Sequence, residues 1–378
     1  MPIKKILITI DWFLPGTNSG GPVRSYANLI EHLNEGFEFL IVTRNSDFGS
    51  SEAYTGIIPN QWTRFNAYTQ VFYCSPDFLT RSNLKTLFQE TTYDVAYTNG
   101  IYSWYFSILP LLLIKNKEVI VSARGMLNPQ AFSVKRFKKQ SFIKMANFFG
   151  LYKNVRFHAT NAEEANFIER LIKAHKGISV APNLPRKLDT TTKTQVVKQL
   201  PTRFVNLARV SVEKGTLTMI KAFNHITAPA VLDVYGPIYD DAYWTKCQFE
   251  IENLPAHIEV NYKGIIQSED VPAILSQYDF FVLLSEGENF GHAILEALSV
   301  GLPVLISDQT PWRHLTEAQV GWDLNLKNED ALSGAFQTAV QMGDLDYKIW
   351  SEAAFVYAKT FIENPTVLEQ NKALFLDA

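Results

Sequence analysis

The sequence has few cysteines and no long hydrophobic run. Only Cys74 and Cys247 occur among 378 residues, which argues against a disulfide framework and a cysteine-based metal site. The longest apolar stretch, Trp104–Ile114, contains Ser107 and Pro110 and has about half the length of a membrane-spanning helix. The first residues run directly into an apolar strand-like segment, without the pattern of a signal peptide. We therefore expect a soluble, cytoplasmic protein.

Acidic residues are missing from a long part of the first half. No Asp or Glu occurs between Val119 and Ala162, where Lys and Arg alternate with phenylalanines. Residues 1–185 hold 20 Lys and Arg against 13 Asp and Glu, whereas residues 186–378 hold 15 against 25. The segment indicates either a peripheral contact of residues 133–157 with an anionic membrane, at its inner face, or an amphipathic helix whose phenylalanines face the core. Nothing else in the chain supports nucleic-acid binding.

The order of apolar segments predicts an α/β fold. Apolar residues make up 47% and charged residues 19% of a chain that is too long for one ordinary core. Short strand-like runs alternate with helix-like segments, which is typical of doubly wound parallel sheets. The expected strands are Ile6–Ile10, Phe39–Val42, Val71–Tyr73, Val95–Tyr97, Val119–Ser122, Arg156–Ala159, Ile178–Ala181, Phe204–Ala208, Val231–Tyr235, Ile258–Lys263, Phe280–Leu284, Val304–Ser307 and Gly321–Leu324.

A polar interval separates two such series. The segment Pro182–Gln195 contains prolines and no apolar period, so it predicts a linker. We expect one Rossmann-like domain over residues 1–185, a linker over 186–200 and a second Rossmann-like domain over 201–345. The helical residues 346–378 follow the last strand and need not belong to the second domain.

The turn between the strand-like run Asp279–Leu284 and the helix His292–Val300 predicts a ligand site. Gly291 lies just before this helix, and helix N-termini at the carboxyl ends of parallel strands bind phosphorylated ligands. Glu288 and Glu296 bracket the turn. Carboxylates repel phosphates, so we expect both to contact hydroxyl groups. A sugar attached to a nucleoside diphosphate carries both kinds of group.

Two cations follow the first strand of the second series. Arg209 and Lys214 lie before a predicted helix. A helix N-terminus offers about half a positive charge, whereas a leaving nucleoside diphosphate carries roughly two to three negative charges. Either a divalent metal or added Arg and Lys must supply the difference. The seven histidines show no metal-ligand spacing and the pair Asp240–Asp241 has no histidine nearby. We therefore expect no metal, although two solvated surface cations are the simpler alternative.

A glycine pair follows the first strand of the chain. Gly20 and Gly21 precede Pro22, which predicts a tight turn into a helix. Glycines let backbone amides approach a phosphate or a sugar closely. A mobile loop without a ligand is the alternative.

Five short motifs follow one another in the second half of the chain: Arg209…Glu213-Lys-Gly215, Tyr235-Gly-Pro237, Tyr262-Lys-Gly264, Glu288-Asn-Phe-Gly…Glu296-Ala-Leu and Gly301-Leu-Pro-Val304. In this order they resemble those of the retaining glycosyltransferases of family 4, the glycosyl transferases group 1. The segment Ser122–Leu127 resembles one common among bacterial members that assemble polysaccharides. The resemblance implies the GT-B fold: an N-terminal acceptor-binding domain facing a C-terminal nucleotide-sugar-binding domain, with helices 346–378 crossing back to the first.

The resemblance also implies roles for individual residues. Arg209 and Lys214 would hold the donor diphosphate without a metal, Glu288 would contact the donor sugar, and Glu296 would accept hydrogen bonds from the ribose hydroxyls. Retention would follow either from Glu288 acting as a covalent nucleophile or from same-face attack in which the leaving phosphate takes the acceptor proton. Further donor contacts are expected from Gly20, Gly21, Asn289, Phe290, Gly291, His292 and Ala293.

The acceptor side departs from the family pattern. Related chains often carry a His-Gly pair after the fourth strand, where this chain has Asn99-Gly100. Asn99 cannot act as a base, so a histidine-dependent role is in doubt there, and His292 is an unconvincing replacement. Asn99 and Arg124 are the candidate acceptor-side residues.

The implied reaction transfers a sugar from a UDP- or GDP-sugar, with no cofactor, to a glycan or lipid-linked glycan in cell-surface polysaccharide synthesis. A sugar-nucleotide 2-epimerase of the same fold and a catalytically inactive sugar-nucleotide-binding partner are the alternatives. A glycan phosphorylase fits less well, because those chains are much longer and hold pyridoxal on a lysine.

Overall fold

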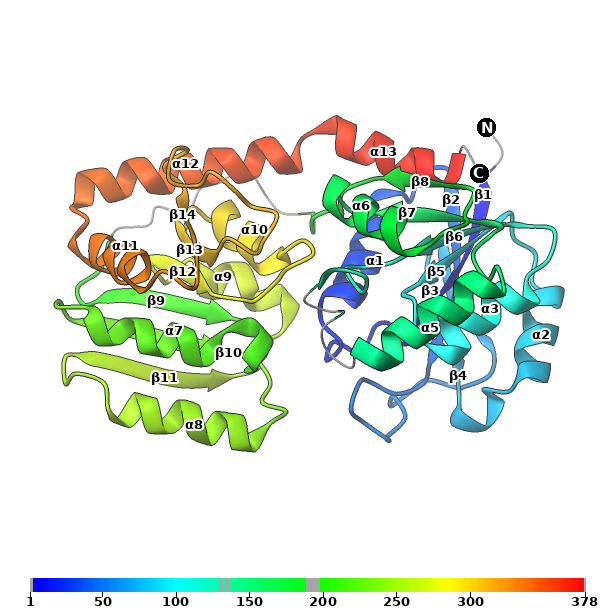
Figure 1. Cartoon of the computed structure of the whole chain (residues 1–378), viewed down its shortest axis with the longest axis horizontal. Helices are drawn as coiled ribbons and strands as arrows, with labels where there is room; N and C mark the ends of the chain where they lie inside the picture. Colours follow the sequence, from blue (N-terminus) through cyan, green and yellow to red (C-terminus); the bar gives the residue numbers. More distant parts are fainter. Residues whose placement is uncertain (1–2, 130–131, 133–135, 188–197, 377–378) are drawn as a thin grey trace. The chain divides into compact units, whose positions relative to one another are not determined.

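The computed structural model describes residues 3–129, 132, 136–187 and 198–376. The chain forms two compact units, the first from Met1–Lys187 with Asn364–Ala378 and the second from Leu188–Glu363. Figure 1 shows a sheet flanked by helices in each unit. Residues 188–197 of the expected linker and 133–135 of the expected membrane segment lie outside the described residues.

The first unit contains an eight-stranded sheet in the order β3-β4-β2-β1-β5-β6-β7-β8. All neighbours are parallel except β3, which pairs antiparallel with β4. Seven of these strands lie where the sequence predicts them, and β3 is an additional edge strand. The strands are β1 (Lys4–Thr9), β2 (Phe37–Arg44), β3 (Trp62–Asn66), β4 (Thr69–Cys74), β5 (Val95–Asn99), β6 (Glu118–Ser122), β7 (Val155–Ala159) and β8 (Gly177–Val180).

Alternation along the strands fills a core on each face of this sheet. In β1, Ile6 and Ile8 belong to one buried cluster and Leu7 to another. Helices cover both faces, and Val367 and Phe375 of α13 lie in the cluster that contains Ile6. The described helices are α1 (Gly21–His32), α2 (Arg81–Glu90), α3 (Leu109–Leu113), α5 (Arg136–Phe148), α6 (Ala162–Leu171) and α13 (Pro365–Leu376).

The second unit contains a fully parallel six-stranded sheet in the order β11-β10-β9-β12-β13-β14. All six strands lie where the sequence predicts them. They are β9 (Thr202–Leu207), β10 (Ala230–Tyr235), β11 (Ile258–Gly264), β12 (Phe280–Leu283), β13 (Val304–Ser307) and β14 (Gly321–Leu324). The helices are α7 (Thr216–Ala222), α8 (Asp241–Glu252), α9 (Val271–Leu275), α10 (His292–Ser299), α11 (Glu329–Gln341) and α12 (Asp344–Ile362).

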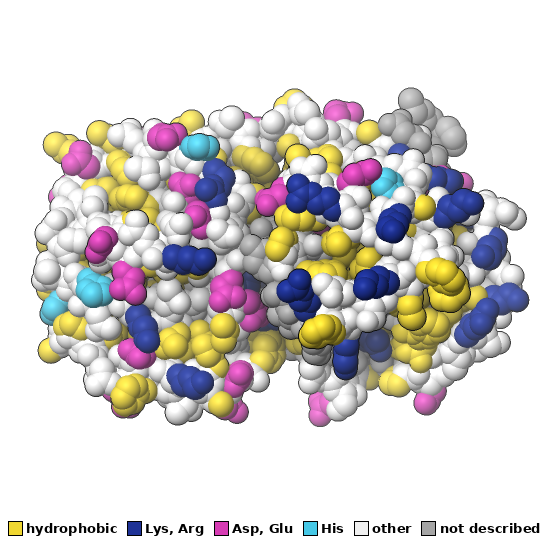
Figure 2. All heavy atoms as spheres, in the orientation of Figure 1, with side chains coloured by type: hydrophobic (Ala, Val, Ile, Leu, Met, Phe, Trp, Pro, Cys, Tyr) yellow, Lys and Arg dark blue, Asp and Glu magenta, His cyan; other side chains and the backbone are white. Residues whose placement is uncertain are grey.

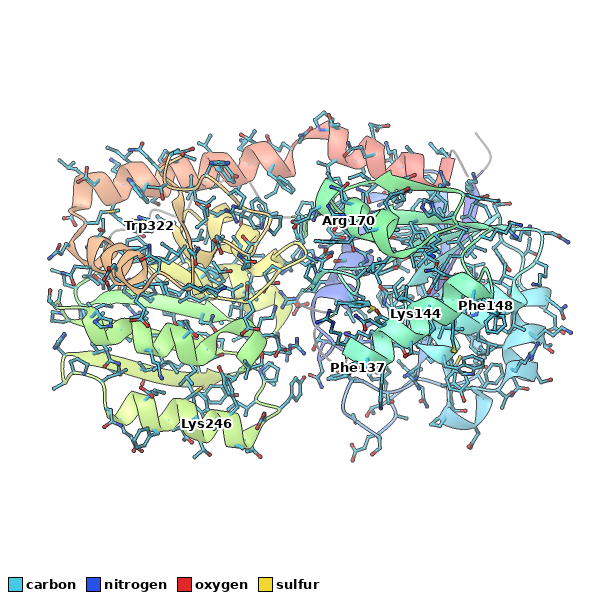
Figure 3. All side chains as sticks on the ribbon, in the orientation of Figure 1. Phe137, Lys144, Phe148, Arg170, Lys246 and Trp322 are labelled. Carbon is cyan, nitrogen blue, oxygen red and sulfur yellow. The ribbon has the colours of Figure 1, made fainter. Side chains whose placement is uncertain are left out.

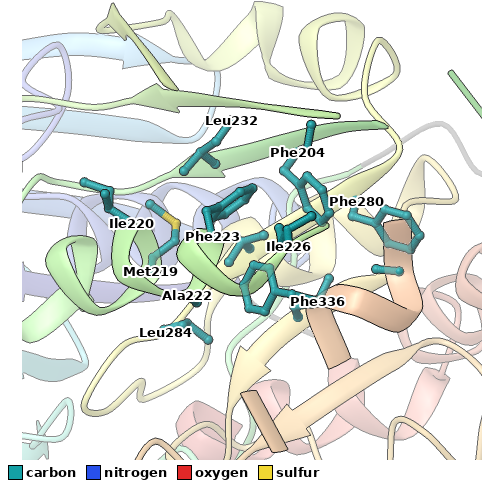
Figure 4. Close-up of a cluster of buried hydrophobic side chains, with 14 of the residues drawn as sticks. Phe204, Met219, Ile220, Ala222, Phe223, Ile226, Leu232, Phe280, Leu284 and Phe336 are labelled. Carbon is teal, nitrogen blue, oxygen red and sulfur yellow. The ribbon is translucent and has the colours of Figure 1, made fainter. Parts of the chain in front are cut away.

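Packed aromatic rings hold one face of the second sheet. Phe204 of β9 lies at its centre, with ring centroids 5.1 Å from Phe223 and 5.9 Å from Phe336. Figure 4 shows these rings grouped with Phe280 between the sheet and the helices. The next residue along β9, Val205, is buried in the cluster on the opposite face. Buried aromatics of this kind are a major source of stability in a core.

The C-terminal helices differ from the expectation that residues 346–378 return together to the first domain. Helix α12 belongs to the second unit, because Ala354 and Ala358 are buried in the cluster that contains Ile294 and Leu298 of α10. Small residues four apart lie on one face of a helix and allow close packing. The chain joins the first unit only from Asn364 onward, where Pro365 starts α13.

No helix within the described ranges is long and apolar enough to cross a membrane.

Candidate active site

The second sheet has its switch point between β9 and β12, where the strand order reverses. Loops that leave two such strands diverge and form the ligand-binding crevice of open α/β sheets. Here the two loops are packed together. The amide of Glu286 donates to the carbonyl of Glu213 over 2.9 Å. Gly215 has φ +66°, and a Cβ atom there would lie 1.9 Å from the carbonyl oxygen of Leu284. Only glycine allows this approach.

A lysine and a glutamate meet across this switch point. Lys214 Nζ lies 2.6 Å from Glu288 Oε1, and the two side chains are 20% and 11% exposed. Lys214 comes from the loop after β9 and Glu288 from the loop after β12. The amide of Glu288 is held by the carbonyl of Gln309, 3.0 Å away. Arg209 also lies after β9, where its guanidinium is 3.0 Å from Glu213 and more exposed.

The turn into α10 is built around Gly291, which has φ +80° and caps the helix. A Cβ atom there would lie 2.7 Å from Cδ1 of Ile294. Trp312, which follows β13 in the chain, donates from Nε1 to the carbonyl of Phe290 over 2.6 Å and so holds the turn in place. The amides of His292 and Ala293 belong to the first turn of α10, where N–H groups point out of the helix and attract anions.

The side chains of the turn divide between core and site. The ring of Phe290 is buried and lies 5.7 Å from Trp312 and 4.7 Å from His292. Phe290 can therefore offer a ligand its backbone but not its ring. Asn289 is half-buried beside it. Glu296 lies one turn inside α10 and is 7% exposed. The donor contacts expected from the residues between Glu288 and Glu296 stay a prediction.

The first sheet has its own switch point, between β1 and β5. Gly20, with φ +73°, caps α1, and Gly21 begins the helix with Pro22 next, so the predicted helix start is confirmed. Asn99 ends β5 and is buried, and its side-chain oxygen has no hydrogen-bond partner among the described residues. Asp11 follows β1 and accepts hydrogen bonds from Ser103 over 2.9 Å and from Arg44 over 3.3 Å.

Asp11 was not predicted as a site residue. Burial raises the pKa of its carboxyl group, although Ser103 and Arg44 act in the opposite direction. The position of an aspartate directly after the first strand was the only signal in the sequence that could have identified it.

Arg124 lies in a buried polar network of the first unit. Its guanidinium donates to Asn183 Oδ1, donates to Tyr97 Oη over 3.2 Å, and lies 4.7 Å from the ring of Tyr26. Tyr97 in turn donates to Nδ1 of His158, 2.6 Å away. These partners give Arg124 a clear structural role, and its contact with an acceptor stays a prediction.

His158 was also missed by the sequence analysis. Its Nε2 donates to the carbonyl of Ala181 over 2.8 Å, which leaves Nδ1 as the acceptor when the ring is neutral. Burial, with a smaller contribution from Arg124, lowers its pKa to about 3.

The expected residues thus form two groups. Arg209, Lys214, the segment 288–293 and Glu296 lie along the carboxyl edge of the second sheet. Gly20, Gly21, Asn99 and Arg124 belong to the first unit. Within the described ranges, no group of three or more His, Cys, Asp or Glu residues is placed to hold a metal ion.

The amino-acid sequence is similar to those of known glycosyltransferases. A family model described as glycosyl transferases group 1 matches residues 190–355. Over 278 residues the chain is 32% identical to a GDP-mannose:cellobiosyl-diphosphopolyprenol alpha-mannosyltransferase of Xanthomonas oryzae pv. oryzae, covering 71% of this chain and 70% of the relative. The enzyme of the same name from Xanthomonas campestris is 24% identical over 279 residues, with the same coverage.

Solved structures show the same fold. A sucrose-phosphate synthase from Thermosynechococcus elongatus aligns with a TM-score of 0.75 at 15% identity, over 99% of this chain and 98% of that one. Anabaena HepE in complex with UDP and glucose aligns with a TM-score of 0.71 at 15% identity, over 99% and 100%. Together with the two parallel sheets, these similarities confirm the GT-B fold that the motifs predicted.

Proposed function

Because this chain belongs to the glycosyl transferases group 1 family and is therefore a glycosyltransferase, we propose that it transfers a sugar from a nucleoside-diphosphate donor to a hydroxyl group of a glycan or lipid-linked glycan. The observation that best supports this donor is the pair Lys214–Glu288 at the switch point of the second sheet, beside the N-terminus of α10. A diphosphate needs cations and amides, and a sugar needs a carboxylate. Both kinds of group occur within this one turn.

Charge balance assigns the diphosphate to the lysine side of the turn. An ammonium group has three donors, so Lys214 can bond Glu288 and a phosphate oxygen at once. The amides of α10 add about half a positive charge, and Arg209 adds a full charge if it leaves Glu213. An exposed pair of this kind is worth little, about 1 kcal/mol or less, so a diphosphate can compete for Arg209. These groups can balance the negative charge of the donor diphosphate without a metal ion.

The carboxylates fit the hydroxyl groups of the donor. Glu288 keeps Oε2 for the sugar while Oε1 bonds Lys214. Glu296, one turn inside α10, is assigned to the ribose hydroxyls. Hydrogen bonds between hydroxyl groups and charged carboxylates contribute about 1.5–3 kcal/mol each.

The transfer is proposed to retain the configuration of the anomeric carbon. The bond from this carbon to the phosphate oxygen breaks while a bond to the acceptor oxygen forms on the same face. The acceptor proton moves to the leaving phosphate oxygen, which Lys214 and the α10 amides stabilise. This charge stabilisation is the largest catalytic contribution. Glu288 is less suited to be a covalent nucleophile, because its ion pair with Lys214 at 2.6 Å stabilises the carboxylate and lowers its reactivity.

The names of the relatives guide the choice of substrates. The donor is a UDP- or GDP-sugar, and GDP-mannose is the first to test because both Xanthomonas relatives are mannosyltransferases that use it. A glycan linked to a polyprenyl diphosphate is the matching acceptor. For such an acceptor we propose a cytoplasmic enzyme that meets the inner membrane face, with residues 133–157 as the expected contact.

A panel of UDP- and GDP-sugars tests the proposal. One donor should raise the melting temperature, since a ligand at about 100 times its Kd stabilises a protein by about 2.7 kcal/mol. With that donor and a lipid-linked glycan, NMR should show a product with the anomeric configuration of the donor, and EDTA should leave the rate unchanged. An inverted product would contradict retention. Epimerised sugar from donor alone would instead identify an epimerase, and donor binding without turnover an inactive partner.

A further inference from the structure

Helix α5 has an exposed aromatic face that the donor site does not explain. Phe137 and Phe148 are 85% and 83% exposed, and Phe149, directly after the helix, is 76% exposed. Figure 3 shows Phe137, Lys144 and Phe148 spaced along this helix. The rings of Phe148 and Phe149 lie 5.0 Å apart, and exposed apolar groups that gather in a patch mark interaction sites.

The geometry of α5 separates this face from the core. At 100° per residue, Phe148 lies about 20° around the axis from Phe137, whereas the buried Ala146 lies about 180° away. Ile143 is buried and Phe142 packs beside it in the same cluster. One set of aromatic and aliphatic residues thus faces the core, and a second set faces solvent.

Positive charge surrounds the exposed rings. Arg136, Lys138 and Lys144 are exposed on the same helix, and no acidic residue occurs between Val119 and Ala162. On the face of the first unit that Figure 2 shows, Lys and Arg side chains lie beside hydrophobic ones, with few acidic groups. Two copies of this chain meeting through α5 would bring like charges together, which disfavours self-association.

We propose that α5 lies flat on an anionic lipid bilayer, with Phe137, Phe148 and Phe149 inserted between the headgroups and Arg136, Lys138 and Lys144 paired with lipid phosphates. Phe137 and Phe148 are 11 residues apart, about 16 Å along the axis, so both reach one plane. Amphipathic helices with aromatic residues on one face and lysines around them bind membranes in this way. This inference rests on the proposed function, and it assigns the membrane contact proposed there to individual residues of α5.

Vesicle sedimentation tests the surface directly. Vesicles of phosphatidylcholine, with or without phosphatidylglycerol, are mixed with the full chain at about 0.1 M and about 1 M salt, without donor or acceptor. The wild-type chain should sediment with the anionic vesicles at low salt and much less with neutral ones. Because no substrate is present, a wrong donor assignment leaves this result unchanged, and absent vesicle binding leaves the donor panel unchanged.

Matched variants identify the residues responsible. Phe137→Ser or Phe148→Ser should each lower the affinity for anionic vesicles roughly tenfold, and Lys144→Gln roughly fivefold. Phe249→Ser, at a 64% exposed position of α8, and Lys246→Gln on the same helix should bind like the wild type. All five positions are exposed, so the variants should keep the melting temperature of the wild type.

Three outcomes would overturn the inference. The wild-type chain could fail to sediment with anionic vesicles at low salt. Phe137→Ser and Phe148→Ser could bind as well as Phe249→Ser. Finally, the chain could ignore vesicles yet dimerise or bind a single-stranded oligonucleotide through the same phenylalanines, which would assign the face to another partner.

Discussion

Lys214 Nζ and Glu288 Oε1 lie 2.6 Å apart, although 73 residues separate them in the sequence, and both side chains are largely buried. The contact joins the loops that leave β9 and β12, the two strands at which the order of the second sheet reverses. In the proposed binding mode, the cation faces the phosphates of the sugar nucleotide and the anion faces its hydroxyl groups. Because the two residues carry opposite charges, their replacement should change the affinity for free nucleoside diphosphate in opposite directions.

Replacement of Glu288 should separate nucleotide binding from turnover. Glu288→Gln removes a negative charge beside the expected diphosphate, so free UDP or GDP should bind severalfold more tightly. Turnover should fall about a hundredfold or more, because the sugar loses its charged partner. Calorimetry measures the first effect and product formation the second. Equal turnover in the variant would remove Glu288 from the site.

Gly215 should tolerate no side chain. In Gly215→Ala the new Cβ would meet the carbonyl of Leu284 at 1.9 Å, with φ at +66°. We expect a loss of more than about 2 kcal/mol in the free energy of unfolding, measured with urea, together with weaker donor binding.

Gly334→Ala provides the matched control. This residue lies inside α11, and a Cβ atom there would meet nothing within 4 Å. Alanine should raise the stability by about 0.5–1 kcal/mol. Equal effects of the two substitutions would contradict the close loop contact at Gly215.

Glu296 should determine recognition of ribose. The wild-type enzyme should use a 2′-deoxyribose donor at least tenfold less well, measured as kcat/KM, because a charged hydrogen bond is lost. Glu296→Gln should weaken use of the normal donor and should discriminate much less between the two donors. Undiminished discrimination in a folded variant would place the ribose elsewhere.

His158 should make the first unit sensitive to acid. Its pKa is lowered to about 3 in the folded protein, chiefly by burial, from a usual value of 6.5. The unfolded chain therefore binds a proton that the folded chain excludes, so stability is present above pH 6.5 and is lost as the pH falls toward 3. In His158→Gln the slope of unfolding free energy against pH should be shallower, by up to about 1.4 kcal/mol per pH unit. An unchanged slope would mean that His158 is accessible or protonated.

Strand positions were predictable because buried parallel strands are short, continuous apolar runs. Phe280–Leu283 and Val304–Ser307 are of this kind. Strand β3 was missed because Trp62–Asn66 is a partly exposed edge strand without a continuous apolar run or an apolar side, and no turn glycine precedes β4. The sequence analysis assigned helix α12 to the first domain, which was wrong. The sequence does not show in which of the two cores Ala354 and Ala358 pack.

The sequence did not show which face of α5 packs against the core, nor which polar residues are buried. Phe137 and Phe142 are both apolar positions of one amphipathic segment, and only the packing of Ile143 and Ala146 shows which faces the core. Asp11 and His158 have no motif around them. Their roles depend on partners far along the chain, Ser103 for the first and Tyr97 for the second.

Glu164 makes a long-range contact that the sequence around it does not reveal. Asn161 caps α6 by accepting from the amide of Glu164. The Glu164 carboxylate, however, accepts from Thr160 and from the amide of Gly125. The acid therefore ties α6 to the loop after β6, and the loop partner has no local signature.

The most direct test of the donor site compares the turnover of Lys214→Ala with that of the control variant Lys221→Ala. Lys221 lies on α7 of the same unit and pairs with Glu250 in an exposed salt bridge. With the donor that stabilises the wild type, release of nucleoside diphosphate by Lys214→Ala should fall by about two to three orders of magnitude at a temperature where the variant is still folded. Lys221→Ala should match the wild type. Near-normal release by Lys214→Ala would contradict the assignment of the donor diphosphate to this site.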